Sequence, residues 1–209
     1  MQIETPMFPF DAILFDVGGV LLTNGWDHRE RAIVAEQFHL NLAEFEARHA
    51  GPNDAWERDA MTVKEYLDAT VFYQPRSFTH DEFLAAIRAQ SQLLPDGAMG
   101  ILQELATSDK CMLGVLNNEA RATNDYRFEK FGIRRYLRVA FSSCYVGLRK
   151  PGTAIYLRAL DILGLPPARV LFVDDRAENT AGAEAAGMKA IQFTGAEALR
   201  RELGTLGVL

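Results

Sequence analysis

The stretch Ile13-Leu14-Phe15-Asp16-Val17-Gly18-Gly19-Val20-Leu21 decides how this sequence is interpreted. An apolar run ends in one aspartate, and two glycines then separate it from a second apolar run. An apolar run of this length bounded by glycine predicts a buried β-strand. Asp16 then lies at the carboxyl end of the strand, the edge at which open α/β sheets bind their ligands. Asp16 is therefore a candidate nucleophile, metal ligand, helix cap or turn residue.

Residues 23–94 contain no run with strand character and show helical periodicity instead. Apolar residues at helical spacing predict a helix over 29–40. Thr62 and Thr79 are each followed three residues later by glutamate, the capping-box signal of a helix start. We expect an all-helical insertion directly after the first strand. The aromatic residues expected to form its core are Trp56, Tyr66, Phe72 and Tyr73.

From residue 95 onward, apolar strand-like runs alternate with helical segments. The expected strands are 111–116, 138–141, 170–173 and 190–193, and the expected helices are 98–106, 120–131, 152–163, 177–186 and a last one at the C-terminus. This alternation is typical of a parallel sheet covered on both faces. The predicted fold class is α/β: a three-layer, Rossmann-like parallel sheet core (1–22 and 95–209) with a helical cap (23–94) inserted after the first strand.

The composition excludes several classes of partner. The chain has 209 residues and a net charge of −6, whereas nucleic acids and anionic membranes select basic surfaces. No apolar run is long enough to span a membrane, and the first residues lack a secretory signal pattern. We therefore expect a cytoplasmic protein without nucleic-acid or membrane partners. An anionic small substrate stays compatible with the charge, because one metal ion or lysine reverses the local field.

Polar residues follow three of the predicted strands: Asp16, the pair Asn117-Asn118 and the pair Asp174-Asp175. Parallel strands bring these residues, together with Lys150, to one edge of the sheet. Carboxylates in such proximity raise one another's pKa unless a cation intervenes, and ligands with oxygen donors only suit Mg²⁺. Lys150 adds a charge for a phosphate or for the nucleophile. The set suits phosphoryl transfer to a carboxylate.

The sequence resembles the haloacid dehalogenase superfamily of hydrolases, in the capped subfamily I whose helical cap follows the first strand. The similarity covers nearly the whole chain. Within it, residues 146–188 are especially similar to the phosphatase domain of bifunctional epoxide hydrolases and to bacterial sugar-phosphate phosphatases. The four segments that match the family's motifs, in the expected order, are 15–21, 116–118, 150–151 and 172–175.

This resemblance implies a role for each residue of the predicted site. Asp16 would be the nucleophile, and Lys150 would neutralise it and hold the phosphate together with Asn118. Asn117 would also donate to the phosphate. The implied Mg²⁺ ligands are Asp16, the backbone carbonyl of Gly18 and Asp175, with Asp174 either bound through water or orienting the lysine. Asn179 would support the acidic loop or be purely structural.

The sequence departs from the family pattern at two positions. Related phosphatases carry a second aspartate, which protonates the leaving group, at the position of Gly18, and a hydroxyl residue at the position of Asn117. The protein is then a slow or narrow enzyme, acts on a substrate with a good leaving group, or binds phosphate without turnover. Asp27 and His28 are possible substitute acids, although an aspartate at a helix start is expected from the helix dipole alone.

The leading hypothesis is a Mg²⁺-dependent phosphatase that acts on a small phosphorylated metabolite through an aspartyl-phosphate intermediate. A 2-haloacid dehalogenase is the alternative within the family, but it needs no metal, and Asp174-Asp175 argues against it. A third hypothesis is a non-catalytic protein that binds a phosphorylated metabolite.

Overall fold

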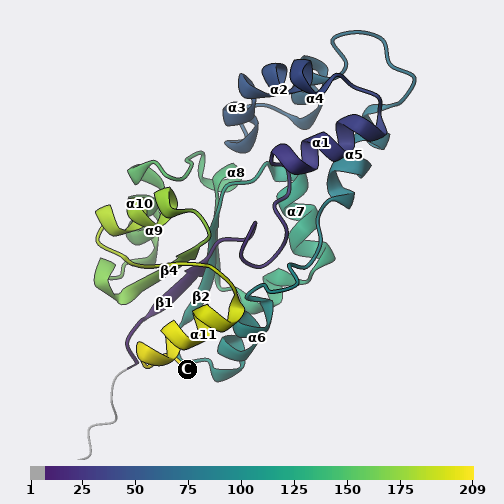
Figure 1. Ribbon diagram of the computed structural model, residues 1–209. Coiled ribbons are helices and arrows are strands. Elements are labelled where there is room, and N and C mark those ends of the chain that lie inside the picture. The colour runs from purple at the N-terminus through teal and green to yellow at the C-terminus, as the bar shows by residue number, and fades with distance from the viewer. Residues whose placement is uncertain (1–7) are drawn as a thin grey trace, which may run out of the picture.

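The computed structural model describes residues 8–209 and, within them, one parallel β-sheet with helices on both faces (Figure 1). The strand order is β3-β2-β1-β4-β5, so that β1 lies in the centre. The strands are β1 (Ala12–Phe15), β2 (Met112–Asn117), β3 (Val139–Ser142), β4 (Val170–Asp174) and β5 (Lys189–Gln192). The predicted α/β fold with a parallel sheet is thereby confirmed.

The central strand β1 is buried on all sides, and all four of its residues are 0% exposed. It pairs in parallel with β2 on one side and with β4 on the other. Phe15 is level with Val115 of β2 and Val173 of β4. The residues that follow Phe15 and Val173 are Asp16 and Asp174, which are therefore level with each other as well. The register places these two carboxylates side by side at the carboxyl edge of the sheet.

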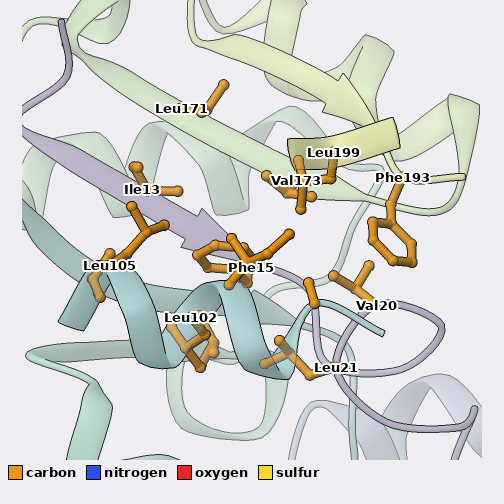
Figure 2. Packing of buried hydrophobic residues seen from close by; sticks show 14 of the residues in the cluster. Ile13, Phe15, Val20, Leu21, Leu102, Leu105, Leu171, Val173, Phe193 and Leu199 are labelled. Carbon is orange, nitrogen blue, oxygen red and sulfur yellow. The ribbon is translucent and has the colours of Figure 1, made fainter. Parts of the chain in front are cut away.

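The side chains of β1 alternate between two apolar layers. Ile13 and Phe15 pack against α6 (Met99–Ser108) and α11 (Ala196–Thr205), as Figure 2 shows around Leu102 and Leu199. Leu14 points to the opposite face. The helices that cover this second face are α9 (Thr153–Leu163) and α10 (Ala177–Ala185). The remaining core helices are α7 (Arg121–Lys130), α8 (Ser143–Val146), and the short 3₁₀ turns Ile133–Tyr136 and Pro167–Arg169.

Five helices lie between β1 and α6 in the chain and group together at one end of the molecule (Figure 1). They are α1 (His28–Gln37), α2 (Leu42–Ala50), α3 (Asn53–Glu57), α4 (Val63–Thr70) and α5 (His80–Ala89). Thr62 and Thr79 form the predicted capping boxes with Glu65 and Glu82 at the starts of α4 and α5. Helices α2 and α3 are present in addition to the three helices predicted for this region. We call α1–α5 the helical insertion.

An aromatic cluster holds the helical insertion together. Trp56 stacks on Tyr66 with ring centroids 3.9 Å apart, and the hydroxyl of Tyr66 accepts a hydrogen bond from Trp26 Nε1 at 2.8 Å. The prediction that Trp56, Tyr66 and Phe72 pack in this core is confirmed. The prediction for Tyr73 is wrong, because its half-buried ring lies 3.4 Å beneath the guanidinium of Arg48 rather than in the apolar cluster.

Two antiparallel connecting segments join the insertion to the sheet. Leu22 pairs with Leu93, and the N–H of Thr23 donates to the carbonyl of Gln92 at 2.9 Å. The division into a core (1–22 and 95–209) and a cap (23–94) stays a prediction, and its residues 1–7 lie outside the described part. Within residues 8–209, no helix combines the length and apolarity needed to cross a membrane.

Candidate active site

The carboxyl edge of the sheet gathers the three residues expected to carry the chemistry. Asp16 directly follows β1, Asp174 ends β4, and Lys150 lies in the loop before α9. All three are buried, with exposed fractions of 8%, 0% and 4%. Burying a charged group is costly in free energy unless the group is paired, so the contacts among these three residues define the centre of the site.

Lys150 bridges the two carboxylates. Its Nζ lies 2.9 Å from Asp16 Oδ1 and 2.6 Å from Asp174 Oδ2. The backbone of Lys150 is held by the side chain of Asn118, which accepts from the Lys150 N–H at 2.9 Å and donates to the Lys150 carbonyl at 2.9 Å. Asn118 therefore fixes where the lysine leaves the backbone, and one N–H of its amide stays available to a ligand.

Asp174 is saturated with donors. The Asn179 amide donates to both carboxylate oxygens, at 2.9 and 3.1 Å, and the backbone N–H of Arg176 donates to Oδ1 at 2.9 Å. Together with Lys150 these donors leave Asp174 little capacity for another ligand. The geometry fits a residue that orients Lys150, and it places Asn179 in support of Asp174.

Asp175 differs sharply from its neighbour. Its Oδ1 is buried and has no hydrogen-bond partner among the described residues. Asp16, Asp174 and Asp175 each offer an oxygen, and these atoms lie within 4.8 Å of one another. Gly19 makes room for this arrangement, because at its φ of +73° a Cβ would lie 2.4 Å from Asp175 Oδ2. A residue with a side chain at position 19 would push Asp175 away.

One lysine does not balance three carboxylates. Burial raises the pKa of Asp16 to about 7, and the Asp174 charge adds to this against the opposing effect of Lys150. Burial and the Asp174 charge also raise the pKa of Asp175. Although burial disfavours the cation, the two carboxylates raise the pKa of Lys150, which stays charged. The site therefore carries excess negative charge that a further cation would relieve.

The donor set fits a hard divalent cation. The free oxygen of Asp175, the nearby carboxylate of Asp16 and the backbone at Gly18 offer oxygen atoms only, which Mg²⁺ prefers over softer metals. A second positive charge beside Asp16 would return its pKa to the acidic range and make it an ionised nucleophile at neutral pH. The observed residues therefore fit the predicted metal.

Comparison with known proteins identifies the family. A family model described as haloacid dehalogenase-like hydrolase matches residues 10–187, which include all the residues of the candidate site. The chain belongs to the haloacid dehalogenase-like hydrolases. It is thus a member of a hydrolase family, as its motifs predict.

Several known proteins resemble the chain along much of its length. Flavin mononucleotide hydrolase 1 of Arabidopsis thaliana is 30% identical over 151 residues, which are 69% of this chain but only 58% of that relative. A sesquiterpene phosphatase of Aspergillus oryzae is 26% identical over 94% of this chain and 96% of its own length. A haloacid dehalogenase family enzyme of Bacteroides thetaiotaomicron, solved with magnesium and inorganic phosphate, shares the fold with a TM-score of 0.75 at 18% identity, covering 89% and 95% of the two chains.

Gly18 is one of the two positions at which this haloacid dehalogenase-like hydrolase departs from the family pattern described above. The space beside Gly18 is filled by Asn24, whose Oδ1 lies 3.0 Å from the position that a Cβ would take. A carboxamide from the connecting segment thus fills the space next to position 18, for which the family pattern described above implies an aspartate. An amide does not donate and recover a proton at neutral pH, so Asn24 replaces the volume and not the chemistry of that aspartate.

Asn117 does not face the cavity. Its Nδ2 donates to Asn124 Oδ1 at 3.0 Å, and its Oδ1 accepts from the Ser142 hydroxyl at 2.7 Å. Both partners are buried, and Asn117 itself is 1% exposed. The structure therefore places Asn117 in a buried polar network that joins β2, β3 and α7, apart from the predicted phosphate-binding residues Asn118 and Lys150.

A cavity of about 220 Å³ lies between the sheet edge and the helical insertion. The sheet side contributes Asp16, Gly18, Asn118 and Lys150, and the opposite wall includes Trp26, Asp27 and Glu57. Of the two substitute acids considered from the sequence, only Asp27 lines this cavity. The other, His28, has a side chain 72% exposed, and its Nδ1 lies 3.0 Å from a carboxylate oxygen of Glu46.

Sequence reasoning missed a buried ion pair at the base of the connecting segments. Arg127 Nη1 binds Glu119 Oε2 at 2.6 Å, and Arg127 Nη2 donates to the carbonyl of Thr23. Gly25 allows this approach, because a Cβ there would lie 2.6 Å from both charged groups. Glu119 directly follows Asn118, and this adjacency was the one signal in the sequence that could have indicated Glu119 as a residue near the site.

Proposed function

We propose that this chain is a Mg²⁺-dependent phosphatase that hydrolyses a small phosphorylated metabolite through an aspartyl-phosphate intermediate. One observation carries the proposal: the buried carboxylate of Asp16 contacts Lys150 at 2.9 Å beside Asp175, whose Oδ1 has no hydrogen-bond partner in the described part of the chain. A nucleophilic carboxylate next to one cation and one free metal-ligating oxygen is an arrangement suited to phosphoryl transfer.

Asp16 would act as the nucleophile. Its carboxylate attacks phosphorus, the bond from phosphorus to the leaving oxygen breaks, and the phosphoryl group is held on Asp16. Water then attacks the same phosphorus and releases inorganic phosphate and the free carboxylate. Lys150 opposes the rise in the pKa of Asp16 and offers its remaining N–H to a phosphoryl oxygen, while Asn118 offers its free amide N–H.

Asp16, Asp175 and the carbonyl of Gly18 are the groups that would hold Mg²⁺. When bound, the ion supplies positive charge that neutralises the phosphoryl oxygens and the clustered carboxylates. Asp174 would then serve mainly to orient Lys150, since Asn179 and the N–H of Arg176 already occupy its oxygens. Of the two roles that the sequence left open for Asp174, binding the metal through water or orienting Lys150, the proposal therefore favours the second.

The cavity supports a small, polar substrate. Its volume of about 220 Å³ lies below the roughly 300–1,000 Å³ of pockets that enclose drug-sized ligands. Its lining combines carboxylates with the cations Arg127, Arg149 and Arg176. The names of the relatives, a flavin mononucleotide hydrolase and a sesquiterpene phosphatase, also point to phosphorylated small molecules, of differing sizes.

The proposal is tested with a panel of small phosphomonoesters that includes an aryl phosphate, assayed with Mg²⁺ and with a chelator. We expect hydrolysis that requires Mg²⁺, and a fall of roughly 10³-fold or more in kcat/KM for Asp16→Asn, because the nucleophile is lost. Asp161→Asn is the matched control, since Asp161 is exposed on α9 and does not line the cavity. Its kcat/KM should equal that of the wild type.

Two other outcomes would replace the proposal. Halide release from a 2-haloacid that persists in chelator would identify a dehalogenase. Binding of beryllium fluoride at Asp16 without turnover of any panel member would identify a protein that only binds phosphorylated metabolites.

A further inference from the structure

The proposed reaction needs a proton donor that the core of the site lacks. The leaving oxygen must gain a proton when its bond to phosphorus breaks, and the attacking water must lose one. Gly18 has no side chain, and Asn24 fills the space beside it. A donor must therefore come from another wall of the cavity.

Two of the carboxyl groups that line the cavity are engaged by cations. Glu119 binds Arg127 at 2.6 Å and also accepts from the hydroxyl of Thr123 at 2.7 Å. Glu57 Oε2 lies 2.6 Å from Nε of Arg149. Either group would have to break an ion pair in order to hold and deliver a proton, which makes both poor general acids.

Apart from the proposed nucleophile Asp16, the remaining carboxyl groups in the lining are Glu178 and Asp27. Glu178 is exposed to solvent in the first turn of α10. Asp27 is half-buried at the N-cap of α1 and receives hydrogen bonds from the N–H of Arg29, at 3.1 Å, and from the carboxyl of Glu30. Asp27 is thus the lining carboxyl group that is joined to a second carboxyl group.

Glu30 is placed to hold the proton of this pair. It is only 8% exposed, and its Oε2 is buried without a hydrogen-bond partner among the described residues, which disfavours the ionised form of this carboxyl group. Burial and the hydrogen bond to Asp27 raise the pKa of Glu30 to about 7. Burial alone would also raise the pKa of Asp27, but hydrogen bonds from Glu30 and Arg29 and the Arg176 charge together lower it.

The charged groups around this pair are few. Arg176 faces Asp27 from the core, and Asn24 donates to it from the connecting segment. On the α2 side, Arg31 is bound to Glu46 at 2.9 Å. The side of α1 that packs on α5 does so through apolar residues such as Val34 and Phe83. The two carboxyl groups therefore lie next to each other with one arginine facing them, an arrangement that favours one proton shared by the pair.

We propose that Asp27, which lines the cavity next to the buried Glu30, is the general acid and base of this enzyme, in the role that no side chain at Gly18 can fill. In the first step the bond from phosphorus to the leaving oxygen breaks, and Asp27 gives that oxygen the proton it holds jointly with Glu30. In the second step the attacking water gives a proton back to Asp27 as the bond from phosphorus to Asp16 breaks. Glu30 is the positioning residue that stores the proton. The inference rests on the proposed phosphatase function.

The decisive experiment compares leaving groups. With Mg²⁺ saturating, Asp27→Asn should lower kcat/KM by roughly 10²-fold on an alkyl or phenyl phosphate, whose leaving oxygen needs a proton. On p-nitrophenyl phosphate, whose anion leaves without one, the same variant should stay within about threefold of the wild type, because little acid catalysis is needed there. Asparagine is as good an N-cap as aspartate, so α1 should stay folded.

Glu30→Gln and Glu36→Gln complete the set. Glu30→Gln should shift the pH profile of kcat/KM for phenyl phosphate, because the carboxyl group that holds the proton is removed. Glu36 is exposed on the same helix, and its substitution should change neither the profile nor the rate. In the metal-free wild type, carboxyl carbon-13 NMR should show one carboxyl signal of this pair titrating near pH 7, and Glu30→Gln should lack it.

The outcomes separate this inference from the proposed function. If the wild type hydrolyses no phosphomonoester, the phosphatase function itself fails. If the wild type is active and Asp27→Asn slows both classes of substrate equally, or neither, Asp27 is not the general acid. If Glu57→Gln, rather than Asp27→Asn, produces the selective loss on poor leaving groups, the role belongs to Glu57 and the inference is overturned.

Discussion

The two walls of the cavity are built on different electrostatic principles. On the sheet side, strand ends force three carboxylates together around a single buried lysine, and the charge is left unbalanced. On the side of the helical insertion, charges are paired: Arg149 binds Asp54 and Glu57, and Asp27 is joined to Glu30. The first wall therefore carries excess negative charge that a cation would balance, whereas the second wall is held by pairs of its own groups.

The largest effect should come from removing the one cation of the sheet side. In Lys150→Ala, Asp16 and Asp174 would stay buried next to each other without a counter-charge. Breaking a buried ion pair in this way costs roughly 3–5 kcal/mol, and we expect the free energy of unfolding in urea to fall by about that amount. Added Mg²⁺ should recover part of it.

Lys189→Ala is the control for this substitution, because Lys189 is exposed on β5. It should leave the free energy of unfolding unchanged within about 0.5 kcal/mol, as is usual for surface substitutions. A loss below about 1 kcal/mol in Lys150→Ala would show that the carboxylates are neutralised by protonation instead, and that the sheet side does not depend on the lysine.

The same contrast explains what could be predicted from the sequence. The sheet edge follows from local signals: apolar runs end in Asp16 and in Asp174-Asp175, and parallel strands align their ends. The capping boxes at Thr62 and Thr79 likewise predict the starts of their helices from four consecutive residues. Such features depend on neighbouring residues in the chain and on a regular fold, so they can be predicted from the sequence pattern.

The insertion side depends on contacts between distant residues, which the pattern does not contain. Arg149 meets Asp54 across 95 positions of sequence, and Arg127 meets Thr23 across 104. The side chain of Asn117 turns toward Ser142 and away from the cavity because of packing between three elements. Rotamer choices and ion pairs of this kind are decided only when the fold brings the residues together.

A smaller effect should distinguish the carboxyl pair of the insertion from the carboxylates of the core. Burial raises the pKa of Glu30 from 4.5 to about 7, so between these values the folded protein binds a proton that the unfolded chain releases. Stability therefore falls as pH rises through this window. Relative to Glu30→Gln, the wild type should lose about 2 kcal/mol of unfolding free energy between pH 4.5 and 7.5.

Urea unfolding at several pH values without metal measures this difference. Asp16 contributes with the same sign, but it is present in both proteins and cancels in the comparison. Glu36→Gln, on the same helix, should follow the wild-type curve. If wild type and Glu30→Gln run parallel across the whole range, Glu30 does not hold the proton and the paired description of this wall is wrong.

The smallest effect should arise at the junction of the two walls. Arg149 of the core lies 3.1 Å from Asp54 Oδ1 and 2.6 Å from Glu57 Oε2 of α3, and it is half-buried. Removing both pairs in Arg149→Ala should weaken docking of the insertion by about 1 kcal/mol, as for partly exposed ion pairs. Since the insertion forms one wall of the cavity, KM should rise about fivefold with little change in kcat.

Salt separates this explanation from a direct contact between Arg149 and the substrate. Ion pairs that hold the insertion are screened as ionic strength rises, so the wild-type KM should increase with added NaCl and approach that of the variant. Arg158→Ala, an exposed position on α9, should keep the wild-type KM and its salt dependence. A variant KM that responds to salt as steeply as the wild type would show that these pairs do not hold the two walls together. The insertion would then be held by apolar packing and by neutral contacts such as the 2.7 Å hydrogen bond from the Ser143 hydroxyl to the Glu57 carbonyl.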